Sequence, residues 1–327
     1  MISPGGPAQH APLPSLIGAR LALTGAGPQY RRQLAELTDT ALVGLWQAAT
    51  TRLGIGTGVA LAAVGSHGRR DAGPTSDLDL MLLHDGTVAP DRLTALARDL
   101  WYPIWDAGLD LDHSVRSLAQ CRQVASADVL TATGLLDLRH QAGDAELSGM
   151  ARSAVFGDWR ATARHRLPEL ILSTRDRAST HGELANLAEA DLKESSGGLR
   201  DAVVCAALSA SGLADRPHSG FDSAYQRLLD ARDALAVTTG RRTHVLRRRY
   251  TAEVASRLGY CNADDLLAEL AECGRVIAAA LAVSVHRARR GQRARTPWRR
   301  PVRRHGRRPP PRLPAVPRPR PAEASPT

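Results

Sequence analysis

Apolar residues recur along the chain with two different periods, and their order predicts the elements. Residues 30–49 carry apolar side chains at helical spacing. Residues 59–64 form a continuous apolar run that predicts a strand, and residues 78–84 form a second one. Residues 90–108 again follow the i, i+3, i+4 spacing of a helix, and residues 109–115 alternate as a strand does. The resulting order of helix, strand, turn, strand, helix and strand is typical of an α/β or α+β fold.

The second half of the chain has a different pattern. From residue 117 to about 290 the spacing is helical almost throughout, with glycine-containing turns near residues 143, 157, 197, 240 and 259. Later residues are rich in arginine and proline without an apolar period, and such a composition cannot build a core. The sequence therefore predicts four segments: a disordered N-terminus at 1–17, an α+β domain at 18–145, an all-helical domain at 146–288 and a disordered tail at 289–327.

The positive charge of the chain is concentrated at one end. The formal net charge is +10, yet residues 287–327 contain 14 arginines and a single acidic residue, Glu323. The rest of the chain is therefore mildly acidic. An acidic surface repels phosphate backbones, so the charge does not support nucleic-acid binding by the folded part.

Composition also bears on the compartment. No apolar run approaches the roughly 18–20 residues of a membrane span, and the N-terminus lacks the charged and apolar regions of a signal peptide. The four cysteines, Cys121, Cys205, Cys261 and Cys273, are widely spaced without a Cys-x-x-Cys pair. This spacing favours buried free thiols over disulfides or a zinc site. We expect a cytoplasmic protein without a membrane span.

Candidate chemistry lies between the first two predicted strands. Asp77 and Asp79 alternate along the second strand, so that their carboxylates share one face. Two neighbouring carboxylates suit Mg²⁺, which prefers hard oxygen ligands and bridges to phosphates. The upstream Gly65–Ser66 turn offers unobstructed backbone N–H groups and a hydroxyl to a phosphate. The turn, the spacer and the Asp-x-Asp pair together predict a nucleotidyltransferase site.

A two-metal site for phosphoryl transfer usually needs a third carboxylate from a neighbouring strand. Asp110 and Asp112 both lie on one face of the next predicted strand, and spacing does not separate them firmly. We expect Asp77, Asp79 and Asp110 to ligate the metals, with Asp112 as the alternative to Asp110. Arg69, just after the turn, is a candidate for neutralising triphosphate charge.

A second polar stretch occupies residues 187–201 and includes the paired glycines Gly197 and Gly198. Lys193 within it is the single lysine among 43 basic residues. A lysine retained where arginine is the default suggests that the guanidinium would not serve there, since the two cations differ in shape and hydration. We therefore group Lys193 with the nucleotide-binding candidates, although the spacing fits an ordinary helix–helix loop equally well.

These motifs resemble those of one enzyme family. The stretch Gly65-Ser66-His67-Gly68-Arg69…Ser76-Asp77-Leu78-Asp79-Leu80, the run His113-Ser114-Val115-Arg116 and the segment Asp191-Leu192-Lys193-Glu194…Gly197-Gly198-Leu199-Arg200-Asp201 are similar to motifs of the bifunctional PII-protein uridylyltransferase/uridylyl-removing enzymes. The resemblance covers about residues 18–285. Ser66 stands where the family has a second glycine, and His67 where it has a tyrosine.

The resemblance implies a polymerase β-like nucleotidyltransferase domain with a mixed sheet, followed by a helical partner domain. Family members continue into an HD hydrolase domain and two ACT domains. The resemblance ends before these, so we expect a truncated chain that lacks uridylyl removal and glutamine sensing. The implied reaction moves UMP, or AMP, from UTP or ATP to a tyrosine of a PII nitrogen-regulatory protein, with two Mg²⁺ ions as cofactors.

Two alternatives remain open from the sequence. The first is a nucleotidyltransferase of the same fold with another acceptor, such as a toxin partner, a small molecule or an RNA. The second is a non-catalytic remnant that only binds PII. The intact Asp77-x-Asp79 pair argues against the remnant, because drift has no reason to preserve it.

Overall fold

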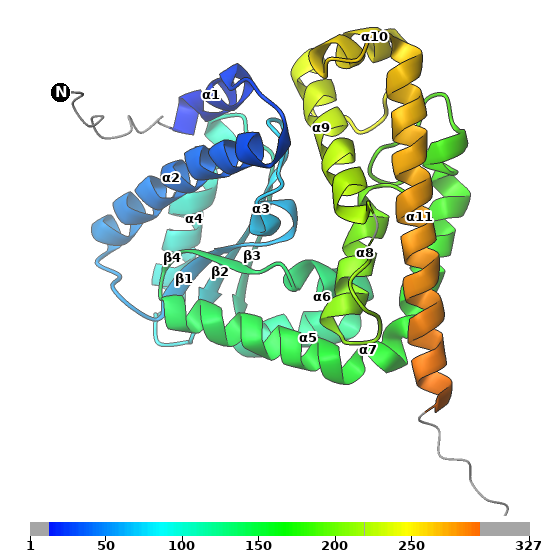
Figure 1. Ribbon diagram of the computed structural model, residues 1–327. Coiled ribbons are helices and arrows are strands. Elements are labelled where there is room, and N and C mark those ends of the chain that lie inside the picture. The colour runs from blue at the N-terminus through cyan, green and yellow to red at the C-terminus, as the bar shows by residue number, and fades with distance from the viewer. Residues whose placement is uncertain (1–12, 219, 295–327) are drawn as a thin grey trace, which may run out of the picture.

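A computed structural model describes residues 13–218 and 220–294, in which a four-stranded sheet lies beside a group of long helices (Figure 1). The strand order is β3-β2-β1-β4. Strand β1 pairs antiparallel with β2 and β4, while β2 pairs in parallel with β3. The strand bounds are β1 Val59–Ala63, β2 Leu78–His84, β3 Leu111–Ser117 and β4 Arg139–Gly143.

The helices fall into two groups along the chain, one for each half of the molecule. Those of the first half are η1 Leu13–Ser15, α1 Leu16–Ala22, α2 Gly27–Leu53, α3 Gly65–Arg69, α4 Pro90–Asp106, α5 Leu118–Ala127 and α6 Val129–Leu135. Those of the second half are α7 Ala145–His181, η2 Leu184–Asn186, α8 Leu199–Ala210, α9 Phe221–Thr239, α10 Arg248–Arg257 and α11 Ala263–Ala294.

Each face of the sheet packs on a separate apolar core. Alternate residues of β2, such as Leu80 and Leu82, point into a core shared with Leu42 of α2 and Leu100 of α4. Met81 and Leu83 point the other way, into a core that continues through α7 into the helical half. Figure 1 shows α7 running along the sheet and on toward α8 and α11. The shared core joins the two halves into one unit.

The main elements predicted from periodicity are confirmed, with shifted ends. Helix α2 is longer than predicted, and β3 begins two residues later than predicted. Helix α4 begins at Pro90 as predicted, and Gly108 beyond its end has the left-handed φ of +73° that favours glycine. The fold is therefore α+β, with a mixed sheet and a helical second half, as the sequence predicts.

Three local predictions are wrong. Strand β4 was not predicted because its sequence, RHQAG, is polar and lies at a sheet edge, where burial leaves little signal. The segment after β1 forms the short helix α3 instead of a simple turn. The turn expected near residue 157 is absent, because α7 continues through Gly157 while its buried face, including Val155 and Trp159, stays in the core.

The expected boundaries of the terminal segments also need correction. Residues 13–17 are helical rather than disordered, since Leu16 is fully buried beside α2. At the other end, α11 extends to Ala294, six residues past the expected boundary at 288. The remainder of the two predicted disordered segments, 1–12 and 295–327, lies outside the described residues. In the described part, no helix is long and apolar enough to cross a membrane.

Candidate active site

The parallel pairing of β2 and β3 brings carboxylates of two strands together. Asp79 pairs in register with Asp112, and such neighbours present their side chains on the same face. Asp77 lies two residues before Asp79 and so faces the same side. The intervening Leu78 is fully buried on the opposite face. Asp110 lies one residue before β3, and its carbonyl accepts the Leu78 amide at 2.9 Å.

The carboxylates of this cluster repel one another. Burial, followed by the negative charges of Asp77 and Asp112, raises the pKa of Asp79 to about 7. Lys193 and Arg69 act in the opposite direction. A divalent cation beside Asp79 would compensate this repulsion, because it stabilises the ionised carboxylates. Register and charge therefore favour Asp112 over Asp110 as the third carboxylate.

The backbone before α3 comes close to this cluster, and a glycine is required there. Gly65 has a left-handed φ of +56°. A Cβ at this position would lie 2.7 Å from Asp79 Oδ2. The Val64 amide also donates to the Asp79 carbonyl at 3.0 Å, which fixes the turn against β2. Ser66 follows directly and is half-buried. The predicted turn and the predicted carboxylates thus meet in space.

Arg69 is engaged by two other carboxylates. Its Nε donates to Asp71 at 2.9 Å, and its Nη1 donates to Asp137. The pKa of Arg69 stays well above its ordinary value because the Asp71 and Asp137 charges outweigh burial. A contact between Arg69 and a triphosphate would cost these two ion pairs. The predicted nucleotide role of Arg69 stays a prediction, and the geometry assigns it to anchoring the loop after α3.

The helical half contributes Lys193 to the same place. Burial lowers the pKa of Lys193, while the Asp77 and Asp79 carboxylates act to raise it. Its loop is tightly folded: the Asp191 carboxylate accepts the Lys193 amide at 2.8 Å, and the Arg200 amide donates to the Lys193 carbonyl at 3.0 Å. A Cβ on Gly197 would lie 2.3 Å from a backbone carbonyl of α11, which explains the glycine. These contacts fix the backbone position of Lys193.

Sequence reasoning missed Arg242, which lies between α9 and α10. Its Nη1 donates to Asp77 Oδ2 at 2.5 Å. No local pattern distinguishes this arginine from its neighbours, because the contact joins residues 165 positions apart. Only the folded chain brings it to the carboxylates.

Sequence reasoning also missed a buried clamp on the loop that leads to Asp77. Arg20 of α1 donates to the Gly73 carbonyl at 2.5 Å, and Arg232 of α9 donates to the Asp71 carbonyl at 2.6 Å. Arg232 is itself held by Asp233 at 2.6 Å. Because all of these charged side chains are buried, the contacts fix the loop firmly and set the position of Asp77 relative to the helical half.

The donor set suits a metal that shares its ligands with a substrate. In the described ranges, no three His, Cys, Asp or Glu side chains are grouped closely enough to hold a metal ion alone. Mg²⁺ sites commonly use one or two carboxylates and take their remaining oxygens from water and substrate phosphates. Asp77 and Asp79 fit such a site, and the strain on Asp79 is what a cation would relieve.

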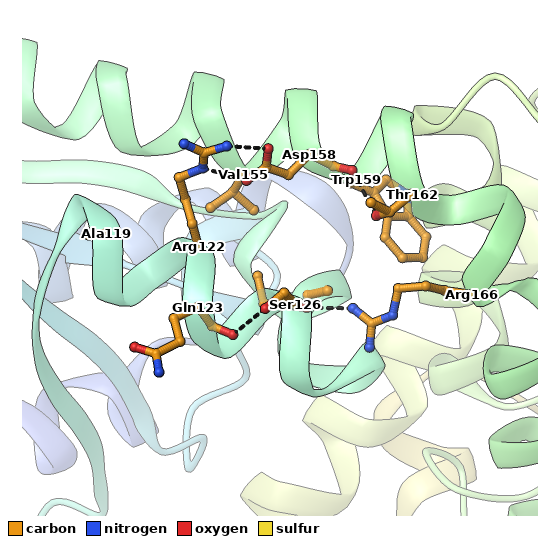
Figure 2. Close-up of a pocket in the computed structure, with 11 residues that line it drawn as sticks. Ala119, Arg122, Gln123, Ser126, Val155, Asp158, Trp159, Thr162 and Arg166 are labelled. Atoms are coloured by element: carbon orange, nitrogen blue, oxygen red, sulfur yellow. Dashed lines mark hydrogen bonds and ion pairs between the residues drawn. The ribbon is translucent and has the colours of Figure 1, made fainter.

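A different hollow, drawn in Figure 2, lies among α5, α6 and α7 and has other chemistry. It encloses about 470 Å³ and is lined largely by apolar atoms, including those of Val155 and Trp159. Arg122 at its rim is paired with Asp158 at 2.6 Å, and Arg166 donates to a backbone carbonyl. Its cations are thus already neutralised or engaged, so the hollow does not compete with the carboxylate cluster as a phosphate site.

The mixed sheet, the carboxylates on β2 and β3 and the helical second half define a nucleotidyltransferase fold followed by a helical region. No family model matches the chain. The chain is 51% identical over 260 residues to a bifunctional uridylyltransferase/uridylyl-removing enzyme of Streptomyces coelicolor. It is 41% identical over 229 residues to the enzyme of the same name from Mycobacterium tuberculosis, and 36% identical over 262 residues to that of Corynebacterium glutamicum.

These matches cover 79%, 68% and 80% of the chain, respectively. They cover 31%, 28% and 36% of the relatives, so the chain spans about a third of their length. The matched region of the chain belongs to the family of bifunctional uridylyltransferase/uridylyl-removing enzymes. The names of these relatives support nucleotidyl transfer in general.

Proposed function

We propose that this chain transfers a nucleotidyl group, UMP or AMP, from a nucleoside triphosphate to a tyrosine of a PII nitrogen-regulatory protein. The observation that carries the proposal is the register pairing of Asp79 with Asp112 beside Asp77, with Gly65 packed against Asp79. Three carboxylates at a glycine turn suit metal-assisted phosphoryl transfer. The relatives' names support the nucleotidyl group, and the resemblance of the motifs supports the acceptor.

In this proposal Asp77 and Asp79 hold two Mg²⁺ ions, and Asp112 takes the place given to Asp110 among the predicted ligands. Bound Mg²⁺ supplies charge neutralisation at the phosphates and favours ionisation of the acceptor hydroxyl. The backbone N–H groups after Gly65 and the Ser66 hydroxyl donate to the triphosphate. Lys193 neutralises part of its charge from the helical side. These groups act by positioning and by electrostatic stabilisation.

The chemical step is an in-line displacement at the α-phosphorus. The tyrosine oxygen attacks from the side of β3, and Asp112 accepts its proton. A new bond forms between this oxygen and the α-phosphorus, while the bond to the β-phosphate oxygen breaks. Pyrophosphate leaves toward Ser66 and Lys193. Because attack and departure occur on opposite sides, the acceptor approaches from the side of β3, an edge strand of the sheet, in this proposal.

Intact-mass spectrometry of a purified PII protein tests this function. The PII protein is incubated with this chain, Mg²⁺, 2-oxoglutarate and either UTP or ATP. A mass gain of one UMP or one AMP that Asp77→Asn abolishes would support the proposal and identify the nucleotide. No gain with either nucleotide, from a chain shown to be folded by circular dichroism, would contradict it.

An acceptor screen with labelled nucleotides distinguishes transfer to PII from transfer to another acceptor. Label transferred to another protein, a small molecule or an RNA, and not to PII, would leave the nucleotidyltransferase site intact and replace the acceptor. Binding of PII without any Mg²⁺-dependent transfer would instead favour the non-catalytic remnant.

A further inference from the structure

Arg242 joins the helical half to a carboxylate that the proposed function gives to a metal. It lies in the connection between α9, which ends at Thr239, and α10, which begins at Arg248. Its guanidinium lies 2.5 Å from Asp77 Oδ2, and its side chain is 46% exposed. The Asp77 side chain is 30% exposed. Both partners can therefore reach solvent and exchange their contacts without disrupting a core.

The ion pair and a metal compete for the same oxygen. A guanidinium at hydrogen-bond distance occupies one of the in-plane lone-pair directions of the Asp77 carboxylate. A divalent cation at that oxygen would also repel the positive charge of Arg242 at close range. Metal binding at Oδ2 of Asp77 therefore requires Arg242 to move away from that oxygen.

The groups around Arg242 indicate which ligand it binds when it leaves Asp77. Lys193 approaches the same carboxylates from the helical half, and its charge acts on His244, two residues after Arg242. Arg200 and Arg232 add positive charge on this side, against the two acidic residues Glu194 and Asp191, so the side is on balance cationic and faces the carboxylates of the β2 and β3 segments. A nucleoside triphosphate with its metals would enter between the two sides and bring strong phosphate acceptors within reach of a displaced guanidinium.

We propose that Arg242 is a nucleotide-binding residue that changes partners: it pairs with Asp77 in the empty site and with the triphosphate once the metal–nucleotide complex binds. In the empty site it balances part of the charge of the carboxylate cluster. In the loaded site it neutralises phosphate charge beside Lys193. The inference rests on the proposed function, because it needs a metal at Asp77 and a triphosphate next to it.

The test uses Arg242→Ala in the full chain, with Arg248→Ala as the matched control six residues away on the exposed start of α10. Two equilibrium affinities are measured. Binding of Mn²⁺ alone is followed by electron paramagnetic resonance, and binding of a non-hydrolysable UTP analogue with Mg²⁺ is followed by calorimetry. Thermal melting shows that each variant is folded.

The proposal predicts changes of opposite sign. Without its competitor at Asp77, Arg242→Ala should bind Mn²⁺ alone about 3–10-fold more tightly, whereas it should bind the analogue about 10-fold more weakly through loss of a charge-assisted contact. Arg242→Lys should restore part of the nucleotide affinity, because a lysine keeps the charge without the bidentate geometry. Arg248→Ala should leave both affinities unchanged.

Equal losses of both affinities in Arg242→Ala would assign the residue a purely structural role and overturn the proposal, as would no change in either. The result is distinguishable from failure of the proposed function. If Arg242→Ala shows the opposite changes in affinity but the wild-type chain does not modify PII, the role of Arg242 is supported and the proposed acceptor is contradicted. A folded wild-type chain that binds neither Mn²⁺ nor the analogue would contradict the site itself, and with it this inference.

Discussion

The two sides of the candidate site are built in different ways. The sheet side presents acidic groups from adjacent strands, Asp77 and Asp79 from the β2 segment and Asp112 from β3. The helical side presents cations from two connections, Lys193 before α8 and Arg242 after α9. The carboxylates owe their positions to strand geometry, whereas the cations owe theirs to packing between distant segments. The site therefore depends on both local chain geometry and the docking of the helical half.

The largest expected effect comes from the sheet side. Asp77→Asn should lower nucleotidyl transfer by about 10³-fold or more, because a neutral amide cannot compensate metal charge in the transition state. The melting temperature should change little, since Asp77 is partly exposed. Initial rates and thermal melts of the same preparation check both parts. Near-normal transfer by the variant would remove Asp77 from the metal site.

Breaking the clamp on the helical side should cost stability. Arg232→Met removes the donor to the Asp71 carbonyl and one of the two arginines paired with buried Asp233, the other being Arg31. Because Arg31 still pairs with Asp233, the free energy of unfolding should fall by about 1–3 kcal/mol, the cost of leaving a buried carbonyl without this donor. Urea unfolding, monitored by circular dichroism, measures this change in the free energy of unfolding.

Arg227→Met on the same helix is the control for this prediction. Arg227 is 54% exposed and pairs with Glu269 at the surface, and the loss of such a pair should cost less than about 1 kcal/mol. Equal effects of the two substitutions would show that the clamp does not hold the halves together.

Substitution of the third carboxylate should have the next largest effect. Asp112→Asn should lower the transfer rate about 10²-fold, by analogy with loss of one acid–base group. Asp110→Asn should lower it less than about 3-fold, because the carboxylate charges that act on Asp79 are those of Asp77 and Asp112. Parallel rate measurements at saturating nucleotide compare the two. The reverse ranking would return the role of third metal ligand to Asp110, as first predicted from the sequence.

A smaller effect is expected from His67, which is buried in α3 on the sheet side. Burial lowers the pKa of His67 to about 4, although Asp39 acts against this. The folded pKa lies below the unfolded value near 6.5, so the unfolded chain binds more protons between these limits. The stability contributed by neutral His67 is therefore complete above pH 6.5 and is lost as the pH falls toward 4.

Urea unfolding at pH 7 and pH 5 tests the titration of His67. From pH 7 to pH 5, the free energy of unfolding of the wild type should fall by about 1–2 kcal/mol more than that of His67→Phe. The exposed His165→Gln variant should behave as the wild type does. Identical pH dependence in wild type and His67→Phe would mean that His67 is protonated normally in the folded chain.

The same contrast explains how far sequence reasoning reaches. The alternation around Asp77 and Asp79, and the glycine at position 65, are local properties, and the structure brings these residues together. The register that favours Asp112 over Asp110 requires knowledge of strand pairing, which spacing alone does not contain. Strand β4 was missed because a polar edge strand has no apolar period.

The helical side was harder to predict for a physical reason. Arg20, Arg232 and Arg242 look like the many surface arginines of this chain until folding places their partners beside them. Lys193 was detectable because it is the single lysine and because it lies in a segment that resembles a family motif. Ion pairs between residues far apart in the sequence form only when the chain packs, so no periodic pattern in the sequence predicts them.

The most direct test of a site shared by the two halves is the affinity of a non-hydrolysable UTP analogue, with Mg²⁺, for the wild type, Lys193→Met and Lys193→Arg. Met has a length similar to the lysine stem but no charge. The account predicts that Lys193→Met binds about 10-fold or more weakly, and that Lys193→Arg recovers only part of the loss. An unchanged affinity in Lys193→Met would contradict it, because the nucleotide site would then belong to the sheet side alone.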